Sequence, residues 1–148
     1  MREELDKILV EKYPKIFRDR YASMQKTCMC WGFDHGDGWF EIIDAMCSSI
    51  QHHIDHIRRQ HPELSDEEFD EQYQVVAVQV KQKFGGLRFY ANNCDDYVYG
   101  VISMAETISW YICENCGSAG AGTKSNSTGW IMMLCDNCHS KNQSRTSS

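Results

Sequence analysis

Two pairs of cysteines near the C-terminal end constrain this chain more than any other feature. Cys113 with Cys116 and Cys135 with Cys138 each enclose two residues, and eighteen residues separate the pairs. A two-residue gap lets both thiolates of a pair reach one ion, and the intervening loop brings the two pairs together in a tetrahedron. The spacing therefore predicts a structural Zn²⁺ site in a finger over residues 113–140. Free thiols or a redox pair are the alternative.

A site closed by four thiolates has no open position for water or substrate, so its metal stabilises a fold and does not catalyse a reaction. Gly117, directly after the first pair, suits the tight turn of such a knuckle, and residues 128–134 predict a strand that leads into the second pair. His139 follows the second pair directly and is an alternative ligand in place of a neighbouring cysteine.

The rest of the chain is typical of a cytoplasmic protein. Its first residues mix acids and bases without an apolar core, unlike a signal peptide, and its longest apolar stretch is far shorter than the ~20 residues of a membrane span. In the cytoplasm the eight cysteines are expected as thiols or metal ligands and not as disulfides. The net charge of −6 argues against a general nucleic-acid coat protein, because phosphate binding usually needs an excess of basic residues.

Residues 1–112 are expected to form an α+β domain of three or four helices around a small antiparallel hairpin. Apolar residues at helical spacing predict helices over residues 2–12, 39–60 and 96–112. Residues 74–92 change to an alternating pattern with a glycine pair, which is typical of a β-hairpin. We therefore expect an α+β body followed by a treble-clef or zinc-ribbon-like finger.

Local signals refine the ends of these elements. Asp37 is the expected N-cap of the long second helix, because its carboxylate can accept from the free amides of the first turn. Ser65 is followed three residues later by Glu68, which is the pattern of a capping box before a short acidic helix. The polar residues 141–148 predict a disordered tail.

The helix predicted over residues 96–112 carries apolar residues on more than one side. Its main stripe is expected to be buried and consists of Val101, Ala105, Ile108 and Ile112. Tyr99 and Trp110 lie on the opposite side together with Ile102, and we expect the N-terminal segment to cover them. Exposure of these aromatic residues at an interface is the alternative.

The hairpin turn is expected at Gly85 and Gly86, because glycine readily takes the positive φ angles of a two-residue turn. This register places Lys83 opposite Arg88 on one face of the hairpin. Directly opposed like charges destabilise a hairpin by a few tenths of a kcal/mol, on the order expected for cross-strand pairs. The pair is therefore more easily explained when an anion binds to it.

The same register places Lys81 opposite Tyr90, and no acid occurs between residues 79 and 92. The candidate anion- or partner-binding surface comprises Lys81, Lys83, Arg88 and Tyr90. Its ligand would be nucleic acid, an acidic partner, or the chain's own acidic residues 63–71. The alternative is a solvated face on which basic residues discourage pairing with another strand.

Three weaker groups of residues have structural explanations as well as functional ones. A second metal site would use Cys28, Cys30, His35, Cys47 and Cys94, although free cysteines are commonly small buried hydrophobes. An acid–base cluster would use Asp34, His35, Asp37 and Glu41, although turn formation explains these residues equally well. His52 and His56 are four residues apart, a spacing that suits a metal ion but equally a solvated helix face, whereas His53 is expected at the edge of the core.

The segments YICENCG and LCDNCHSKN resemble the knuckles of treble-clef modules, which occur in HNH nucleases and in the DnaK-suppressor class of RNA polymerase regulators. Residues 117–134 contain no histidine that could act as the general base of an HNH nuclease. The chain also lacks the long coiled-coil hairpin that the polymerase regulators need. The resemblance to both families therefore covers the finger alone.

A wider resemblance covers most of the chain. The segments GFDHGDGWFEIID and VQVKQKFGGLRFY, together with the finger, resemble a family of small phage- and prophage-encoded proteins. This resemblance implies a viral origin without implying an activity. We expect a non-enzymatic, phage-type zinc-binding accessory protein that binds a host protein, with inhibition of a host defence or regulatory complex as one role. A nucleic-acid-binding or transcription-associated protein is the first alternative and a nuclease-like enzyme the second, and no membrane partner is expected.

Overall fold

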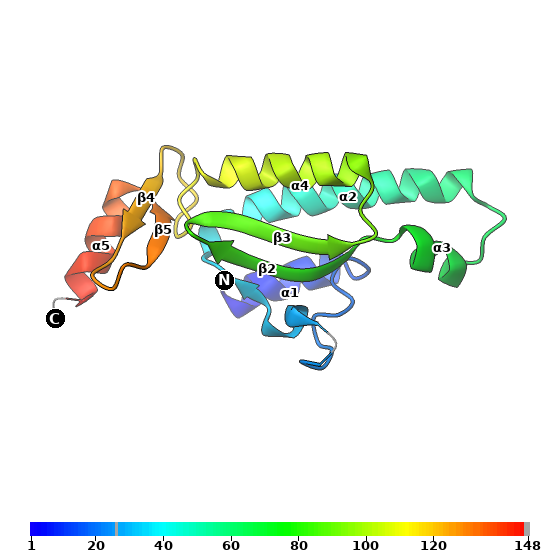
Figure 1. The fold of residues 1–148 in the computed structure, drawn as a ribbon, viewed down its shortest axis with the longest axis horizontal. Coiled ribbons are helices and arrows are strands. Elements are labelled where there is room, and N and C mark those ends of the chain that lie inside the picture. Colours follow the sequence, from blue (N-terminus) through cyan, green and yellow to red (C-terminus); the bar gives the residue numbers. More distant parts are fainter. Residues whose placement is uncertain (26, 147–148) are drawn as a thin grey trace.

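The structure is a computed structural model that describes residues 1–25 and 27–146, and it has a mixed α+β fold. The elements in chain order are α1 (Glu3–Lys12), η1 (Cys28–Trp31), β1 (Phe33–Asp34), η2 (Asp37–Trp39), α2 (Phe40–Gln60), α3 (Asp66–Tyr73), β2 (Val76–Lys83), β3 (Gly86–Asn92), α4 (Asp96–Ser109), β4 (Gly122–Ser125), β5 (Ile131–Leu134) and α5 (Asp136–Thr146). The finger lies at one end of the molecule and α3 at the other (Figure 1). Among residues 1–25 and 27–146, no helix combines the length and the apolar character needed to cross a bilayer.

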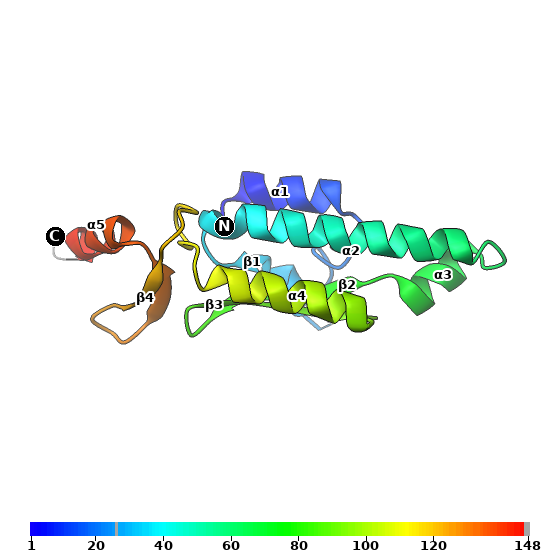
Figure 2. The ribbon, with the colours of Figure 1, turned by 90° about the horizontal axis from the view of Figure 1, so that it is seen from above.

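The body contains a three-stranded sheet in the order β1-β2-β3, with β1 parallel to β2 and β3 antiparallel to it. Helices α1, α2 and α4 contribute to a single core against one face of this sheet, and α2 lies between α1 and α4 (Figure 2). Fully buried members of this core include Trp39, Ile43, Ile50, Val80 and Leu87. A second sheet of β4 and β5 belongs to the finger.

The hairpin turn is one residue earlier than the sequence predicts. Its two central residues are Phe84 and Gly85, with φ angles of 52° and 90°, so Lys83 lies opposite Gly86 and Lys81 opposite Arg88. The expected pairings of Lys83 with Arg88 and of Lys81 with Tyr90 are therefore wrong. Gly86 has a different reason to be glycine, since a Cβ atom there would lie 2.6 Å from the Trp110 ring.

Helix α4 buries a different stripe from the predicted one and ends earlier, at Ser109. Its buried residues are Val98, Ile102, Ala105 and Ser109, whereas Ile108 is 41% exposed and Tyr99 is 59% exposed. Trp110 is half-buried against the hairpin and not under the N-terminal segment. Contacts of α4 with both β3 and α2 select this stripe, and they are not visible in the pattern of one helix.

The contact between α4 and the sheet includes the outer edge of β3. Leu87 N donates to Ser109 Oγ at 3.0 Å, and Phe89 N donates to Glu106 Oε2 at 3.0 Å. Two backbone amides that point away from the sheet thus donate their hydrogen bonds to side chains of α4. This explains why a serine and a glutamate lie on or beside the buried stripe of α4.

Three expected helix ends can be compared with the structure. The capping box of Ser65 and Glu68 is confirmed at the start of α3. Asp37 does not cap α2, because η2 precedes that helix and the Asp37 carboxylate instead binds the side chain of Arg2 at 2.7 Å. Residues 141–146 belong to α5 and not to a disordered tail, while the last two residues of that predicted tail lie outside the described residues.

Candidate metal centre

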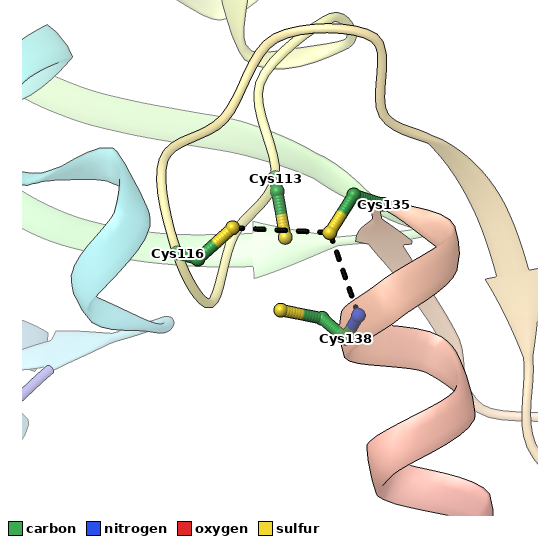
Figure 3. Close-up of side chains that lie close together, drawn as sticks. All are labelled: Cys113, Cys116, Cys135 and Cys138. Carbon is green, nitrogen blue, oxygen red and sulfur yellow. Dashed lines mark hydrogen bonds between the residues drawn. The ribbon is translucent and has the colours of Figure 1, made fainter.

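The four predicted cysteine ligands come together in the finger (Figure 3). Their Sγ atoms all lie within 4.8 Å of one another, and those of Cys116 and Cys135 are 3.8 Å apart. A tetrahedral ion with bonds of about 2.3 Å to sulfur requires edges of about 3.8 Å between sulfur atoms. The cluster therefore can hold a metal ion of that size, and its donor set of four thiols suits zinc.

Different elements supply the two pairs. Cys113 and Cys116 lie in the loop after α4, whereas Cys135 directly precedes α5 and Cys138 lies in the first turn of that helix (Figure 3). The predicted strand before the second pair is confirmed as β5. This order of knuckle, hairpin and helix is compatible with a zinc-ribbon-like finger. His139 is absent from the cluster, and its Nε2 atom instead lies 3.1 Å from Gln143 Nε2.

Hydrogen bonds around the cluster favour thiolates. The backbone amide of Cys138 donates to Cys135 Sγ at 3.4 Å, and this bond is the main cause that lowers the pKa of Cys135 to about 6. The Ser118 side chain lies 3.1 Å from Cys116 Sγ and lowers the pKa of that thiol. Metal binding needs deprotonated sulfur, so these hydrogen bonds favour binding through Cys116 and Cys135, whereas burial raises the pKa of the Cys138 thiol.

The first knuckle is anchored to the body by Gly38 and Trp39, through contacts that the sequence did not predict. Gly38 N donates to the Glu114 carbonyl oxygen at 2.7 Å, and Trp39 Nε1 donates to the Ile112 carbonyl oxygen at 3.0 Å. A Cβ atom on Gly38 would lie 2.5 Å from Gly117 N and still closer to the Cys113 carbonyl oxygen. A glycine before a buried tryptophan is a weak sequence signal for such an approach.

Glu114 strengthens the same contact. Its Oε1 atom accepts from Gly36 N at 3.1 Å, while its Oε2 atom is buried without a hydrogen-bond partner among the described residues. Burial raises the pKa of this carboxyl to about 7. The knuckle and the segment before α2 thus form one packed unit across the expected domain boundary at residues 112 and 113.

The candidate second metal site is not assembled. The four-cysteine cluster is the only group of three or more histidine, cysteine or acidic side chains positioned to share an ion within the described part of the chain. Cys47 is fully buried in α2, and burial raises the pKa of its thiol. His52 and His56 are exposed on α2, whereas His53 binds Asp95 at 2.7 Å at the edge of the core, as predicted.

The candidate acid–base residues have separate surroundings. The His35 ring is buried between Phe33 and Trp39, with ring centroids 6.0 and 5.7 Å away, and burial lowers its pKa to about 4. Asp37 is bound to Arg2, as described above. Asp34 is exposed on β1, and Glu41 lies on α2 beside an apolar groove.

The candidate anion-binding residues lie on the sheet face opposite the core, since Gln82 and Phe89, which alternate with them along the strands, are buried. Lys81 and Arg88 are cross-strand neighbours, and β1 places Asp34 beside Lys81. Lys81 and Lys83 also line a cleft of about 310 Å³ between the hairpin turn and the finger. The aromatic residues of this cleft are Phe84 and Trp130, which are 72% and 59% exposed.

A groove larger than this cleft lies elsewhere, between α2 and α4, and the sequence did not predict it. It has a volume of about 740 Å³ and an almost entirely apolar lining that includes Ile42, Ala45, Val101, Met104 and Ile108. Figure 2 looks onto these two helices, and no other element is drawn over them.

Comparison of the chain with protein-family models, curated proteins and solved structures gives no match in any of the three.

Proposed function

We propose that this chain is a non-enzymatic, zinc-binding accessory protein that acts by binding another protein. The observation that carries this proposal is the uncovered apolar groove between α2 and α4. Met104 in this groove is 62% exposed and Ile108 is 41% exposed. Contiguous apolar surface of this kind marks interaction sites in soluble proteins, because leaving it in water is unfavourable.

Zn²⁺ is the proposed metal, held by Cys113, Cys116, Cys135 and Cys138 in a treble-clef finger. Four thiolate ligands saturate the ion, so its contribution is folding energy and not catalysis. The contacts of Gly38 and Trp39 with the first knuckle transmit this stabilisation to the start of α2. The metal therefore supports one end of the groove-bearing helix as well as the finger.

The resemblance of residues 32–44 and 78–90 to small phage- and prophage-encoded proteins supports a viral setting for this function. In that setting the partner is a host protein in the cytoplasm. Occupying the surface of that protein would inhibit a host defence or regulatory complex. Inhibition by occupancy needs no turnover, which agrees with a ligand-saturated metal and an apolar contact surface.

Affinity capture from a bacterial lysate tests this proposal when two matched variants accompany the wild-type chain. Met104→Glu places a charge in the groove, and Met24→Glu places one at a methionine that is 68% exposed outside it. We expect Met24→Glu to retain the protein that the wild type captures and Met104→Glu to lose it. Capture by both variants would contradict a role for the groove.

Titration of the purified partner then separates binding from catalysis. The effect of a binder saturates near one equivalent and follows the binding constant. A full effect at a hundredth of an equivalent, growing with time, would contradict the non-enzymatic proposal. Loss of that activity in His35→Ala, with the fold retained, would identify the acid–base residues as an active site.

The cleft between hairpin and finger favours single-stranded nucleic acid as a second candidate partner. Exposed aromatic rings stack on bases and neighbouring lysines attract phosphates, which is the usual combination in sequence-tolerant single-strand binding. Phe84 and Trp130 supply the rings here, and Lys81 and Lys83 supply the charges. Lys83 Nζ lies 6.0 Å from the centre of the Phe84 ring, so the two kinds of group are adjacent.

Fluorescence anisotropy with a labelled 20-mer of thymidine tests this second candidate. Lys83→Gln should weaken binding and lower the salt dependence by about one phosphate contact, whereas Lys7→Gln on α1 should do neither. Trp130→Ala should weaken binding by about tenfold, because stacking contributes about 1–3 kcal/mol per base. Absence of salt-dependent binding in the wild type would remove nucleic acid as a partner.

A further inference from the structure

The groove between α2 and α4 has the side-chain spacing of a helix-binding surface. On α4, its wall includes Tyr97, Val101, Met104 and Ile108, which are spaced by four, three and four residues. On α2, Ile42, Ala45 and Ser49 face them with spacings of three and four residues. Apolar residues at this spacing form the stripe into which the side chains of another helix insert.

The two walls also set the length of the occupant. The α2 wall extends from Glu41 to Ser49 and the α4 wall from Asp96 to Ile108. With a rise of 1.5 Å per residue, these segments are about 12 and 18 Å long. A helix of about three turns fills this distance.

The charged residues of the groove indicate which charges the bound helix carries at its ends. Glu41 and Asp96 are the only charged residues that line the groove, and neither forms an ion pair within the described residues. Both lie in the first turn of a helix. α4 contains no lysine or arginine.

The two carboxylates lie at opposite ends of the groove because α2 and α4 are antiparallel. His53 near the C-terminal half of α2 binds Asp95, directly before α4. At the other end, Trp39 before α2 binds the carbonyl of Ile112 after α4. A long apolar surface thus has one unpaired negative charge near each end.

We propose that this groove binds an amphipathic helix of a partner protein, whose apolar side chains fill the groove and whose lysine or arginine residues pair with Glu41 and Asp96. This inference rests on the proposed function and specifies the partner's chemistry. A second copy of this chain fits less well, because it would bring two more carboxylates to the groove without a cation. Its net charge of −6 would add to that repulsion.

Two synthetic 16-residue peptides test the proposal with the full-length, metal-loaded protein. Both carry the same leucine stripe, and they differ only in having lysine or glutamate at their ends. We expect fluorescence anisotropy at low salt to show binding of the lysine peptide at least tenfold more tightly than the glutamate peptide. Met104→Glu should abolish this binding, while the matched Met24→Glu should leave it unchanged.

The double variant Glu41→Gln, Asp96→Asn tests whether these two carboxylates cause the selectivity for the lysine peptide. It should bring the two peptides to within about twofold of each other while both still bind, because the apolar stripe is intact. Selectivity that survives in this variant would overturn the role of the two carboxylates. Added salt should likewise reduce the difference between the peptides in the wild type.

Three other results would overturn the inference, and the first two leave the proposed function standing. Equal binding of both peptides would refute a basic partner, and binding of neither would refute a helical one. Sedimentation that shows a wild-type dimer and a Met104→Glu monomer would assign the groove to a second copy. The proposed function is tested separately: it fails if Met104→Glu retains the captured partner, or if titration of that partner shows turnover.

Discussion

Gly38→Ala tests whether the metal-binding knuckle is held to the body by the close backbone approach before α2. Alanine at this position would place Cβ 2.5 Å from Gly117 N and closer still to the Cys113 carbonyl oxygen. Both neighbours are backbone atoms of the knuckle, so no flexible side chain can move away. The two segments must separate.

The expected cost follows from the hydrogen bonds that join the segments. These bonds run from Gly38 N to Glu114 O at 2.7 Å, from Gly36 N to Glu114 Oε1 at 3.1 Å, and from Trp39 Nε1 to Ile112 O at 3.0 Å. At about 1 kcal/mol each, their loss destabilises the fold by about 3 kcal/mol. Alanine also restricts the unfolded chain, which returns up to about 1 kcal/mol. We therefore expect the free energy of unfolding to fall by about 2 kcal/mol.

Urea denaturation of the metal-loaded protein measures this change, and competition with a chromogenic chelator measures the zinc affinity. If docking and metal binding are fully coupled, a loss of about 2 kcal/mol weakens zinc binding by about thirtyfold, since 1.4 kcal/mol is tenfold. Gly122→Ala is the matched control, because a Cβ atom there meets nothing within 4 Å and the residue also lies in the finger. A Gly38→Ala protein within about 0.5 kcal/mol of Gly122→Ala would refute the reasoning.

Three further outcomes are expected. Elemental analysis should find about one zinc per chain, and Cys135→Ser should lose the metal and loosen residues 113–146 as chelation does; a folded, metal-free wild type would contradict this. Phe84→Asn should stabilise the protein by about 1 kcal/mol in thermal unfolding, because asparagine tolerates the φ of 52° better than phenylalanine; Gly85→Val in the same turn should destabilise it. Because burial lowers the pKa of His35 from 6.5 to about 4, the unfolded chain binds this proton first as the pH falls. Stability should therefore fall between pH 6.5 and 4, by about 2 kcal/mol at pH 5 relative to pH 7.5, and His35→Gln should lack this loss in denaturation at the two pH values.

Features that depend on nearby residues could be predicted from the sequence. The ligand spacing of the cysteines brings four sulfur atoms together, and the capping box of Ser65 and Glu68 begins α3, because both patterns are complete within a short segment. The hairpin was predicted correctly as an element but not in register. Gly85 and Gly86 can both adopt a positive φ, and the choice depends on Trp110, which packs on Gly86 from a distant part of the chain.

The buried face of α4 and the groove beside it could not be predicted for a related reason. Apolar residues occur all round this helix, so periodicity does not distinguish the stripe of Ile102 from that of Ile108. The polar groups of Glu106 and Ser109 indicate the inner side only when β3 is known to lie there. Because Glu106 and Ser109 face β3, Met104 and Ile108 lie at the surface. These two residues line the candidate binding groove, so the groove follows from the same orientation of the helix.

The two hydrogen bonds from α4 to β3 also affect how the protein avoids unwanted assembly. The outer strand of a sheet normally offers free amides to any extended peptide, and this is the route to strand addition and to fibrils. Here Glu106 and Ser109 occupy the amides of Phe89 and Leu87, so an incoming strand would have to displace a helix first. Concentrated solutions of the protein should therefore resist β-type aggregation at this edge even though aromatic residues are exposed on either side of it.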